Sequence, residues 1–244
     1  MTRTVVVTGG AKGIGRAICE RFAALGDSVV ALGRDADALS SLPEGLAGVV
    51  CDVSDEARVA AVFGSLATVD VLVNNAGVAE SAPLHRTSAE QFRRHLEVNA
   101  LGAFLCMRAV VPGMRERGAG AIVTVASTAG RIGAPYTAAY TASKHAAVGL
   151  TRAVAAELAG TGVRVNAVCP TFVDTELTAR SIERIVQATG RTAEEARRAL
   201  ERATPLGRLL EPGEVADAVV YLASDAARAV SGQAIVIDGG GVQA

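Results

Sequence analysis

The sequence TVVVTGGAKGIGR, from Thr4 to Arg16, joins a short apolar strand to a glycine-rich turn and the start of a helix. Glycines at such a turn permit positive φ angles and let main-chain N–H groups approach a phosphate closely. The spacing of Gly9, Gly13 and Gly15 differs from the G-x-G-x-x-G of the usual dinucleotide fingerprint. The position between the first strand and the first helix nevertheless predicts a dinucleotide site. An ordinary glycine-rich turn is the alternative.

Beyond this turn, short β-rich runs alternate with helical patterns along the chain. This alternation predicts an α/β fold: a Rossmann-type, doubly wound parallel sheet of seven strands with helices on both faces. The expected strands are Thr4–Thr8, Ser28–Leu32, Gly48–Cys51, Asp70–Val73, Ala121–Ala126, Val163–Val168 and Ala234–Ile237. The expected helices are Gly15–Ala24, Ala36–Leu42, Glu56–Leu66, Ala89–Arg117, Ala138–Ala159 and Glu214–Ala223. Residues 1–244 are expected to form a single dinucleotide-binding and catalytic domain.

The stretch from Thr171 to Pro212 has no expected strand, although connections in α/β folds usually take about 2–6 residues. Within it, Arg180–Ala188 and Ala193–Ala203 read as helices separated by Gly190. Open α/β folds bind ligands at the carboxyl edge of the sheet, where this insertion falls. Residues 171–212 are therefore expected to form a substrate lid. A packing helix pair that mediates subunit contact is the alternative.

Composition excludes several classes of protein. The chain is 50% hydrophobic but only 3% aromatic, so its core must consist of aliphatic side chains, which suits a buried parallel sheet. A net charge of -1 leaves no basic excess for nucleic acid. The apolar runs are shorter than the ~20 residues of a membrane helix, and no secretory segment is recognisable. The four separated cysteines are expected to be buried thiols of a cytoplasmic protein.

The end of the second expected strand discriminates between nicotinamide cofactors. An enzyme that prefers NAD places a carboxylate there to hold the ribose 2′-hydroxyl. Here Gly33 takes that position, Arg34 follows it, and Lys12 adds a second cation from the glycine turn. Because arginine grips phosphate with two parallel hydrogen bonds, these residues favour NADP(H) over NAD(H). Asp35 is expected to cap the next helix, whereas Asp52 fits either an adenine contact or a helix cap.

Further polar residues stand at strand ends or in apolar surroundings. Tyr140 and Lys144 lie one helical turn apart and so share a face. Ser127 follows an expected strand at the carboxyl edge of the sheet, and the Asn74–Gly77 stretch follows another. Asn99 lies inside an apolar helical run, where its amide needs a partner.

Together these motifs resemble the short-chain dehydrogenase/reductase family, of the kind with a single compact domain. The resemblance covers the whole chain, and the Ser-to-Tyr spacing is also the family's. Its motifs are T-G-x-x-x-G-x-G at Thr8–Gly15, N-N-A-G at Asn74–Gly77, Asn99, Ser127 and Y-x-x-x-K at Tyr140–Lys144. Five ordered motifs in register make the match highly specific.

The resemblance implies roles for four catalytic residues. Tyr140 is the expected general acid in ketone reduction and the base in the reverse direction. A phenol has a reference pKa of about 10, so Lys144 and the oxidised nicotinamide are expected to lower the pKa of Tyr140. Lys144 is also expected to hold the nicotinamide ribose, and Ser127 to orient the substrate oxygen. Asn99 is expected to bend its helix and place a water that links Lys144 to solvent.

The resemblance also implies a set of cofactor contacts and settles Asp52 in favour of adenine. The expected contacts are Thr8, Gly9, Lys12, Gly13, Ile14, Gly15, Arg34, Asp52, Val53, Asn75, Ala76, Gly77, Tyr140, Lys144, Pro170, Val173 and Thr175. One departure is Thr171, where the family commonly has Gly. A threonine does not adopt positive φ readily, so the turn beside the nicotinamide is expected to differ slightly.

The resemblance bears on assembly and metal as well. Ser231–Gln233 and Asp238–Gly240 look like the family, whose last strand and preceding helix often pack across a subunit interface, so a homotetramer is expected. His85, His95 and His145 have no metal-ligand spacing, and no metal is expected.

Three hypotheses of function follow. The stretch from Tyr140 to Thr175 looks most like acyl and polyketide ketoreductases, which predicts NADPH-dependent reduction of a 3-oxoacyl thioester carried on coenzyme A or acyl carrier protein. The second hypothesis is a dehydrogenase or reductase of a free alcohol or ketone such as a sugar, steroid or xenobiotic. The third is a catalytically silent nucleotide-binding regulator, which would lack Tyr140, Lys144 or Ser127, all present here. Three arginines are candidates for a carrier phosphate, although the surface is the commoner place for each: Arg131, Arg180 and Arg184.

Overall fold

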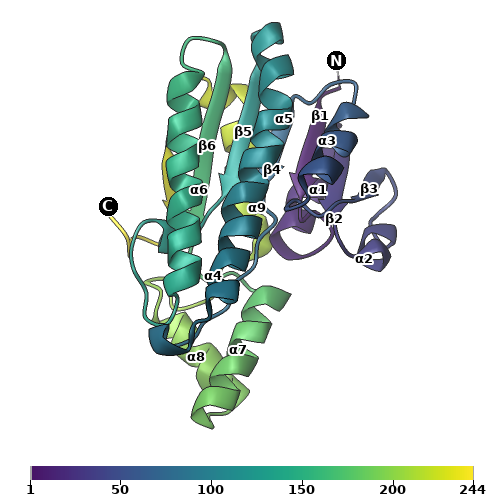
Figure 1. Cartoon of the computed structure of the whole chain (residues 1–244). Coiled ribbons are helices and arrows are strands. Elements are labelled where there is room, and N and C mark those ends of the chain that lie inside the picture. The colour runs from purple at the N-terminus through teal and green to yellow at the C-terminus, as the bar shows by residue number, and fades with distance from the viewer. Residues whose placement is uncertain (1, 244) are drawn as a thin grey trace.

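Seven short runs rich in Val, Ile and Ala form one parallel sheet in the computed structural model, which describes residues 2–243 (Figure 1). The strand order is β3-β2-β1-β4-β5-β6-β7. The strands are β1 (Thr4–Thr8), β2 (Ser28–Gly33), β3 (Leu46–Val50), β4 (Val71–Asn74), β5 (Gly120–Val125), β6 (Val163–Pro170) and β7 (Ala234–Ile237). The prediction of a doubly wound, seven-stranded parallel sheet is confirmed.

Helices cover both faces of this sheet (Figure 1). They are α1 (Gly13–Ala24), α2 (Ala36–Ser40), α3 (Glu56–Gly64), α4 (Ala89–Leu96), α5 (Gly102–Arg117), α6 (Ala138–Glu157), α7 (Glu176–Thr189), α8 (Ala193–Arg202) and α9 (Pro212–Ala223). Because side chains alternate along a strand, β1 serves both faces. Val5 and Val7 pack with Phe22 of α1 and Val219 of α9, whereas Val6 packs with Met107 of α5 and its neighbours.

Several predicted boundaries need correction. The strand predicted at Gly48–Cys51 is Leu46–Val50, because its register is fixed by pairing with β2, where Val29 stands opposite Leu46. The first lid helix begins at Glu176 rather than Arg180. The strands predicted at Thr4–Thr8 and Ala234–Ile237 match at both ends, and the other elements differ by one or two residues at one or both ends.

The predicted helix Ala89–Arg117 is continuous in space but changes its winding. A π-helical turn at Glu97–Leu101 joins α4 to α5. Within the described part of the chain, this is the one helix long and apolar enough to cross a membrane by length and composition. It packs against the sheet through Leu105, Cys106 and Met107, as a core helix does. All four cysteines are buried and free, as expected.

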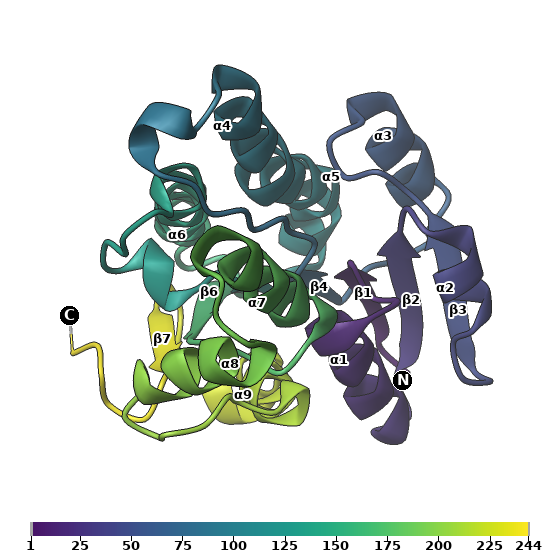
Figure 2. The same ribbon diagram turned by 90° about the horizontal axis from the view of Figure 1, so that it is seen from below.

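The strand order reverses beside β1, because the chain builds outward through β2 and β3 and then returns to add β4 on the other side. Such a reversal leaves a crevice at the carboxyl ends of the two central strands, the usual ligand site of an open α/β sheet. Figures 1 and 2 show α7 and α8 projecting beyond this edge. The fold therefore brings the residues at the strand ends under the helix pair.

The close packing of the glycine turn predicts a specific stability effect. A Cβ at Gly15 would lie 2.0 Å from the Gly9 carbonyl oxygen and 2.5 Å from Asn75 Nδ2, so Gly15→Ala must displace the turn. We expect it to lower the free energy of unfolding by about 1–3 kcal/mol. The matched control Gly149→Ala, on the exposed face of α6 with nothing within 4 Å, should raise it by about 0.5–1 kcal/mol. Urea unfolding measures both, and equal stability of the two variants would contradict the packing described.

Candidate active site

The ends of the two central strands are fastened to each other. Thr8, the last residue of β1, accepts hydrogen bonds at Oγ1 from the main-chain N–H groups of Asn75 and Ala76, both at 3.0 Å. In return, Asn75 Nδ2 donates to the carbonyl oxygens of Thr8 (2.9 Å) and Gly9 (3.1 Å). The sequence placed Asn75 among the cofactor contacts, and the structure adds that its side chain fixes the glycine turn.

The N-terminus of α1 fits the pyrophosphate of a dinucleotide. The first N–H groups of a helix have no intrahelical acceptor and carry the positive end of the helix dipole. At α1 no side chain caps them, since the cap residue Lys12 makes no capping hydrogen bond and the first turn holds no acidic residue. Gly9, Gly13 and Gly15 let the turn pack closely against Ala76, Thr175 and its own backbone, which sets the position of these donors.

The cations expected to hold a 2′-phosphate are present but already paired. Lys12 Nζ lies 3.0 Å from Asp35 Oδ2 and 3.9 Å from Glu176 Oε2, and Arg34 Nη1 lies 3.7 Å from Asp52 Oδ2. The prediction that Lys12 and Arg34 stand at this position with no carboxylate beside them is therefore wrong, since Asp35 and Asp52 pair with them. Asp35 also caps α2, as expected, by accepting from the Ala38 N–H at 3.0 Å. That hydrogen bond and Lys12 hold the pKa of Asp35 below its usual value.

Tyr140 and Lys144 converge on the end of β5 from the first turns of α6. Lys144 is 6% exposed, and its Nζ donates to the Val125 carbonyl oxygen at 2.9 Å and lies 5.8 Å from the centre of the Tyr140 ring. Burial lowers the pKa of Lys144 to about 8. Burial raises the pKa of Tyr140, while a hydrogen bond with Ser127 acts in the opposite direction. The expected lowering of the tyrosine pKa is therefore not produced by protein groups alone.

Ser127 follows β5 and begins the short 3₁₀ turn Thr128–Gly130. Its Oγ accepts a hydrogen bond from the Ala129 N–H at 3.1 Å, which fixes the side chain and leaves its hydroxyl proton free to be donated. The hydroxyl thus stands beside Tyr140, as the sequence predicted.

Asn99 lies in the π-helical turn, which is the bend that the resemblance implied. Its Oδ1 accepts from the Val78 N–H at 2.8 Å, and its Nδ2 donates to the Val78 carbonyl oxygen (3.0 Å) and to Ser143 Oγ (2.9 Å). A Cβ at Gly77 would meet Asn99 Oδ1 at 3.1 Å and Lys144 Nζ at 3.6 Å, so a larger residue there would press on the Asn99 amide. Asn99 therefore ties the segment after β4 to the catalytic helix.

His95 was not predicted to belong to the site, because the sequence showed only that its spacing does not fit a metal ligand. His95 is fully buried, and its ring meets the Tyr140 ring edge-on at 6.3 Å between centroids. Nε2 accepts from the Glu80 N–H at 3.1 Å, and Nδ1 lies 2.8 Å from the Gln91 carbonyl oxygen, which identifies a neutral ring with its proton on Nδ1. The available signal was its position one helical turn before Asn99 on the same face.

The remaining predicted cofactor residues line the same edge of the sheet. Pro170 ends β6, and the buried Val173 forms a β-bridge with Leu210. A Cβ at Gly13 would touch Thr175 Cγ2 at 3.2 Å, so Thr175 lies against the glycine turn. Ile14 packs against the core, and Val53 lies under α5, where a Cβ on Gly102 would meet its Cγ2 at 2.6 Å.

Thr171 follows β6 without a positive φ; within residues 2–243, Tyr136 is the one non-glycine residue that adopts it. The Thr171 N–H donates to the Ile237 carbonyl oxygen at 3.0 Å, which anchors this turn to β7. Among the described residues no group of three or more His, Cys, Asp or Glu side chains is arranged to hold a metal ion.

Comparison with known proteins identifies the family. The family model described as Enoyl-(Acyl carrier protein) reductase matches residues 9–241. The 2-(R)-hydroxypropyl-CoM dehydrogenase of Xanthobacter autotrophicus is 39% identical over 254 residues, which cover 98% of each chain. Galactitol 2-dehydrogenase (L-tagatose-forming) of Cereibacter sphaeroides is 41% identical over 244 residues, covering 96% of this chain and 92% of that one. The structure of actinorhodin polyketide ketoreductase with NADPH matches with a TM-score of 0.92 and 38% identity, covering 98% and 97% of the two chains.

The chain belongs to the short-chain dehydrogenase/reductase family, as its motifs indicated. It is accordingly an oxidoreductase that acts on alcohols or ketones, and its family uses NAD(H) or NADP(H).

Tyr140 gives the first test of the site. Tyr140→Phe removes the transferable proton but keeps the ring that packs against His95, so turnover should fall about 100- to 10,000-fold. Cofactor affinity, measured by calorimetry, should fall far less than turnover, because Tyr140 is one of many expected cofactor contacts and the N-terminus of α1 is untouched. Full turnover by this variant would exclude Tyr140 as the acid.

Because the ammonium of Lys144 is buried, we expect that replacing Lys144 abolishes activity but raises the free energy of unfolding. Its pKa is lowered to about 8, so the folded state resists protonation more than the unfolded state does. This penalty is complete below pH 8 and disappears as the pH rises toward the pKa of the unfolded chain. Lys144→Met should therefore be inactive yet more stable at pH 7 by about 1–3 kcal/mol, with a smaller gain at pH 10. Urea unfolding at the two pH values checks this, and a gain that grows with pH would refute it.

Proposed function

We propose that this protein is an NADP(H)-dependent reductase that converts a 3-oxoacyl thioester, on coenzyme A or acyl carrier protein, into the 3-hydroxyacyl thioester. The observation that carries the proposal is the convergence of Tyr140, Lys144, Ser127 and Asn99 at the carboxyl edge of the sheet, where Asn99 is hydrogen-bonded to Val78 after β4 and Lys144 to Val125 of β5. The likeness to a polyketide ketoreductase over 98% of the chain supports this substrate class.

In this mechanism the carbonyl oxygen of the substrate lies between two hydroxyl donors. Ser127, fixed by the Ala129 N–H, donates to that oxygen and orients it. Tyr140 donates its proton as negative charge develops on the same oxygen, and in the reverse reaction it receives that proton. The nicotinamide of the bound cofactor supplies or accepts the hydride. The chain contributes position, charge and the proton.

Lys144 and Asn99 support the proton donor. The Lys144 ammonium stands beside the tyrosine ring and stabilises the phenolate left after proton transfer. Its hydrogen bond to the Val125 carbonyl oxygen holds it at the end of β5, and the same ammonium is the group that would hold the nicotinamide ribose. Asn99, which anchors Val78, would place the water that links Lys144 to solvent.

The preference for NADP(H) rests on Arg34 and Lys12. Both side chains are about half exposed and reach the end of β2 from two directions. Their present partners, Asp35 and Asp52, are also solvent-accessible, and ion pairs of this kind contribute little to stability. A 2′-phosphate carries more charge than a carboxylate and accepts a bidentate arginine, so it competes well for both cations.

Residues 171–212 serve in this proposal as the substrate lid, with α7 and α8 standing over the carboxyl edge. The proposed assembly is a homotetramer. The family resemblance supports it, and β7, an edge strand whose four residues are half-buried, and the exposed Tyr221 of α9 are consistent with a subunit contact there.

The second candidate function is oxidation or reduction of a free alcohol or ketone. The relative that favours it is galactitol 2-dehydrogenase, whose name gives a polyol as its substrate. The chain keeps Ser127, Tyr140 and Lys144 in contact, which speaks against a catalytically silent regulator.

Absorbance of NADPH separates the two candidates. The proposal predicts reduction of acetoacetyl-CoA with a kcat/KM at least about 100-fold above that of neutral ketones such as cyclohexanone, because the thioester carrier adds binding energy that is used at the reacting centre. Oxidation of galactitol with NADP+ or NAD+ tests the second candidate, an enzyme that acts on a free alcohol. Turnover of the free substrates alone would replace the first candidate with the second.

The cofactor preference has its own test. Arg34→Ala should lower kcat/KM for NADPH by about 10-fold or more, the worth of a charge-assisted hydrogen bond, and leave the value for NADH nearly unchanged. Arg21→Ala is the control, since Arg21 pairs with Asp217 on the far side of α1. Equal losses with the two cofactors, or none with either, would contradict the role of Arg34.

A further inference from the structure

Arg184 of α7 joins the lid to the wall of the active site. Its Nη2 donates to the Ala79 carbonyl oxygen at 2.9 Å and to Ser181 Oγ at 3.0 Å. Ala79 stands between two residues already tied to the catalytic centre. Val78 is held by Asn99, and the Glu80 N–H is held by His95, whose ring packs against Tyr140.

The guanidinium of Arg184 is half-buried and its charge is unpaired. Within residues 2–243 no carboxylate lies within 4.0 Å of it, and both groups that it contacts are neutral. Its Nε is buried and has no hydrogen-bond partner. Leaving a charged donor unsatisfied in a buried position is unfavourable, and native proteins do so chiefly where a ligand or an ion completes the site.

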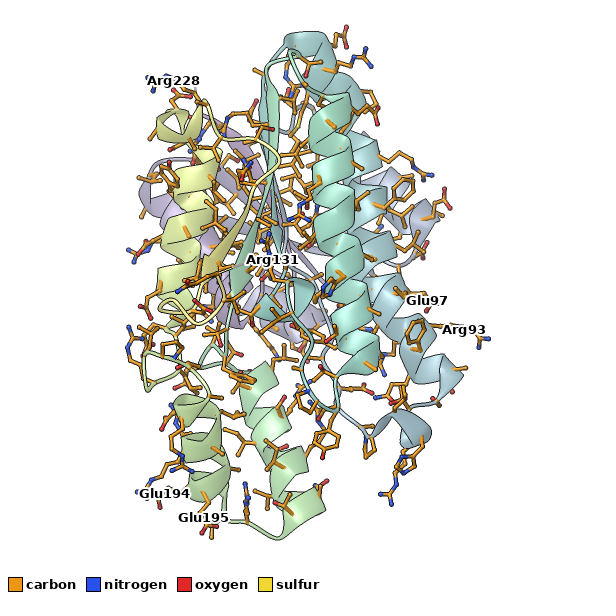
Figure 3. The ribbon with its side chains drawn as sticks, turned by 90° about the vertical axis from the view of Figure 1, so that its left-hand side faces the viewer. Arg93, Glu97, Arg131, Glu194, Glu195 and Arg228 are labelled. Atoms are coloured by element: carbon orange, nitrogen blue, oxygen red, sulfur yellow. The ribbon has the colours of Figure 1, made fainter. Side chains whose placement is uncertain are left out.

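The other lid arginines show that this arrangement is not a general property of the helix pair. Arg180 pairs with Glu176, Arg197 with Asp174, and Arg198 with Glu194. Arg191 lacks a carboxylate partner too, but it is exposed to water at the junction of the two lid helices. Figure 3 shows the outer end of the lid, marked by Glu194 and Glu195, well away from the sheet.

We infer that Arg184 is the anchor for an anionic group of the substrate, so that the substrate class is a ketone or secondary alcohol carrying a phosphate or a carboxylate. An oxyanion gives the guanidinium the charge partner that the protein does not provide, and arginine binds such groups through two parallel hydrogen bonds. The inference rests on the proposed oxidoreductase function and narrows it. A carrier phosphate and a free carboxylate share this chemistry, and the experiment separates them.

The experiment compares charged probes with neutral twins that have the same reacting ketone. Acetoacetyl-CoA is paired with acetoacetyl-N-acetylcysteamine, a thioester without phosphate, and acetoacetate is paired with methyl acetoacetate. Dissociation constants are measured by calorimetry on the NADP+-saturated protein, and KM and kcat by NADPH absorbance. The variants are Arg184→Gln, Arg184→Lys, Arg131→Gln and the control Arg191→Gln, with thermal unfolding to verify that each is folded.

The expected result is a selective loss. Arg184→Gln should weaken binding of the charged member of a pair by about 10-fold or more, raise its KM by a similar factor, and leave kcat and both neutral twins unchanged. Arg184→Lys should recover part of the affinity because it restores the charge without the planar fork. Arg191→Gln should match the unchanged protein throughout. Selectivity confined to the coenzyme A pair identifies a carrier phosphate, and selectivity confined to acetoacetate identifies a free carboxylate.

Three outcomes would overturn the inference. The first is an equal loss for charged and neutral probes in Arg184→Gln, which would mean that Arg184 only holds the lid. The second is that the unchanged protein binds neither charged probe more tightly than its neutral twin, and the third is that the selective loss arises in Arg131→Gln instead. Arg131 is the competing cation near the site, and Figure 3 places it beside the sheet rather than on the lid. A failure of the proposed function looks different. In that case acetoacetyl-CoA is not reduced, while the binding comparison still reports on Arg184.

Discussion

The reciprocal hydrogen bonds between Thr8 and Asn75 are the constraint on which the rest of the site depends. They join the carboxyl ends of β1 and β4, the two strands between which the strand order reverses. Because the glycine turn and the N-N-A-G turn are held together, the uncapped N-terminus of α1 faces the same crevice as the end of β4. The residues after Asn75 then reach Asn99 and Lys144. This contact therefore sets the position of the proposed cofactor site relative to the segment that Asn99 holds.

Among residues 2–243, 11 of the 24 lysines and arginines lie within 4.0 Å of a carboxylate. The net charge is -1 because cations and carboxylates are almost equal in number, and some of them form pairs, such as Lys12 with Asp35 and Arg197 with Asp174. Within residues 2–243, four buried or half-buried cations have no carboxylate partner: Arg131, Lys144, Arg164 and Arg184. Arg164 is satisfied by three main-chain carbonyl oxygens, whereas Lys144 and Arg184 lie at the site. Lys144 lies beside Tyr140, and Arg184 lies between the lid and the segment after β4. Their unfavourable burial is the physical reason for assigning them to binding and chemistry rather than to stability.

Much of this arrangement was predictable from the sequence because the family motifs are local. The glycine turn, the Tyr140–Lys144 pair and the sheet topology each follow from a short stretch of residues and the strand–helix alternation. Strand β3 was misplaced since its register depends on its partner and not on its own composition. The ion pairs of Lys12 and Arg34 could not be predicted, because they join residues on different loops.

The same limitation explains His95 and Arg184. Each acts through main-chain groups of residues 79 and 80, which come close only in the folded chain. The one local signal for His95 is its spacing of four residues from Asn99, and an arginine on an amphipathic helix has none that distinguishes it from a surface residue. The π-helical turn was predicted in part. The resemblance implied that Asn99 bends its helix, but the sequence did not show that the distortion is a π-helical turn.

In the proposed mechanism a single group, Tyr140, gives a proton in reduction and takes it back in oxidation. The most direct test is the pH dependence of kcat/KM in both directions with one substrate pair, acetoacetyl-CoA and 3-hydroxybutyryl-CoA. We expect kcat/KM for oxidation to rise with pH as a single proton is lost, and kcat/KM for reduction to fall as the same group ionises. Rates in both directions that are independent of pH, or that rise together, would contradict it.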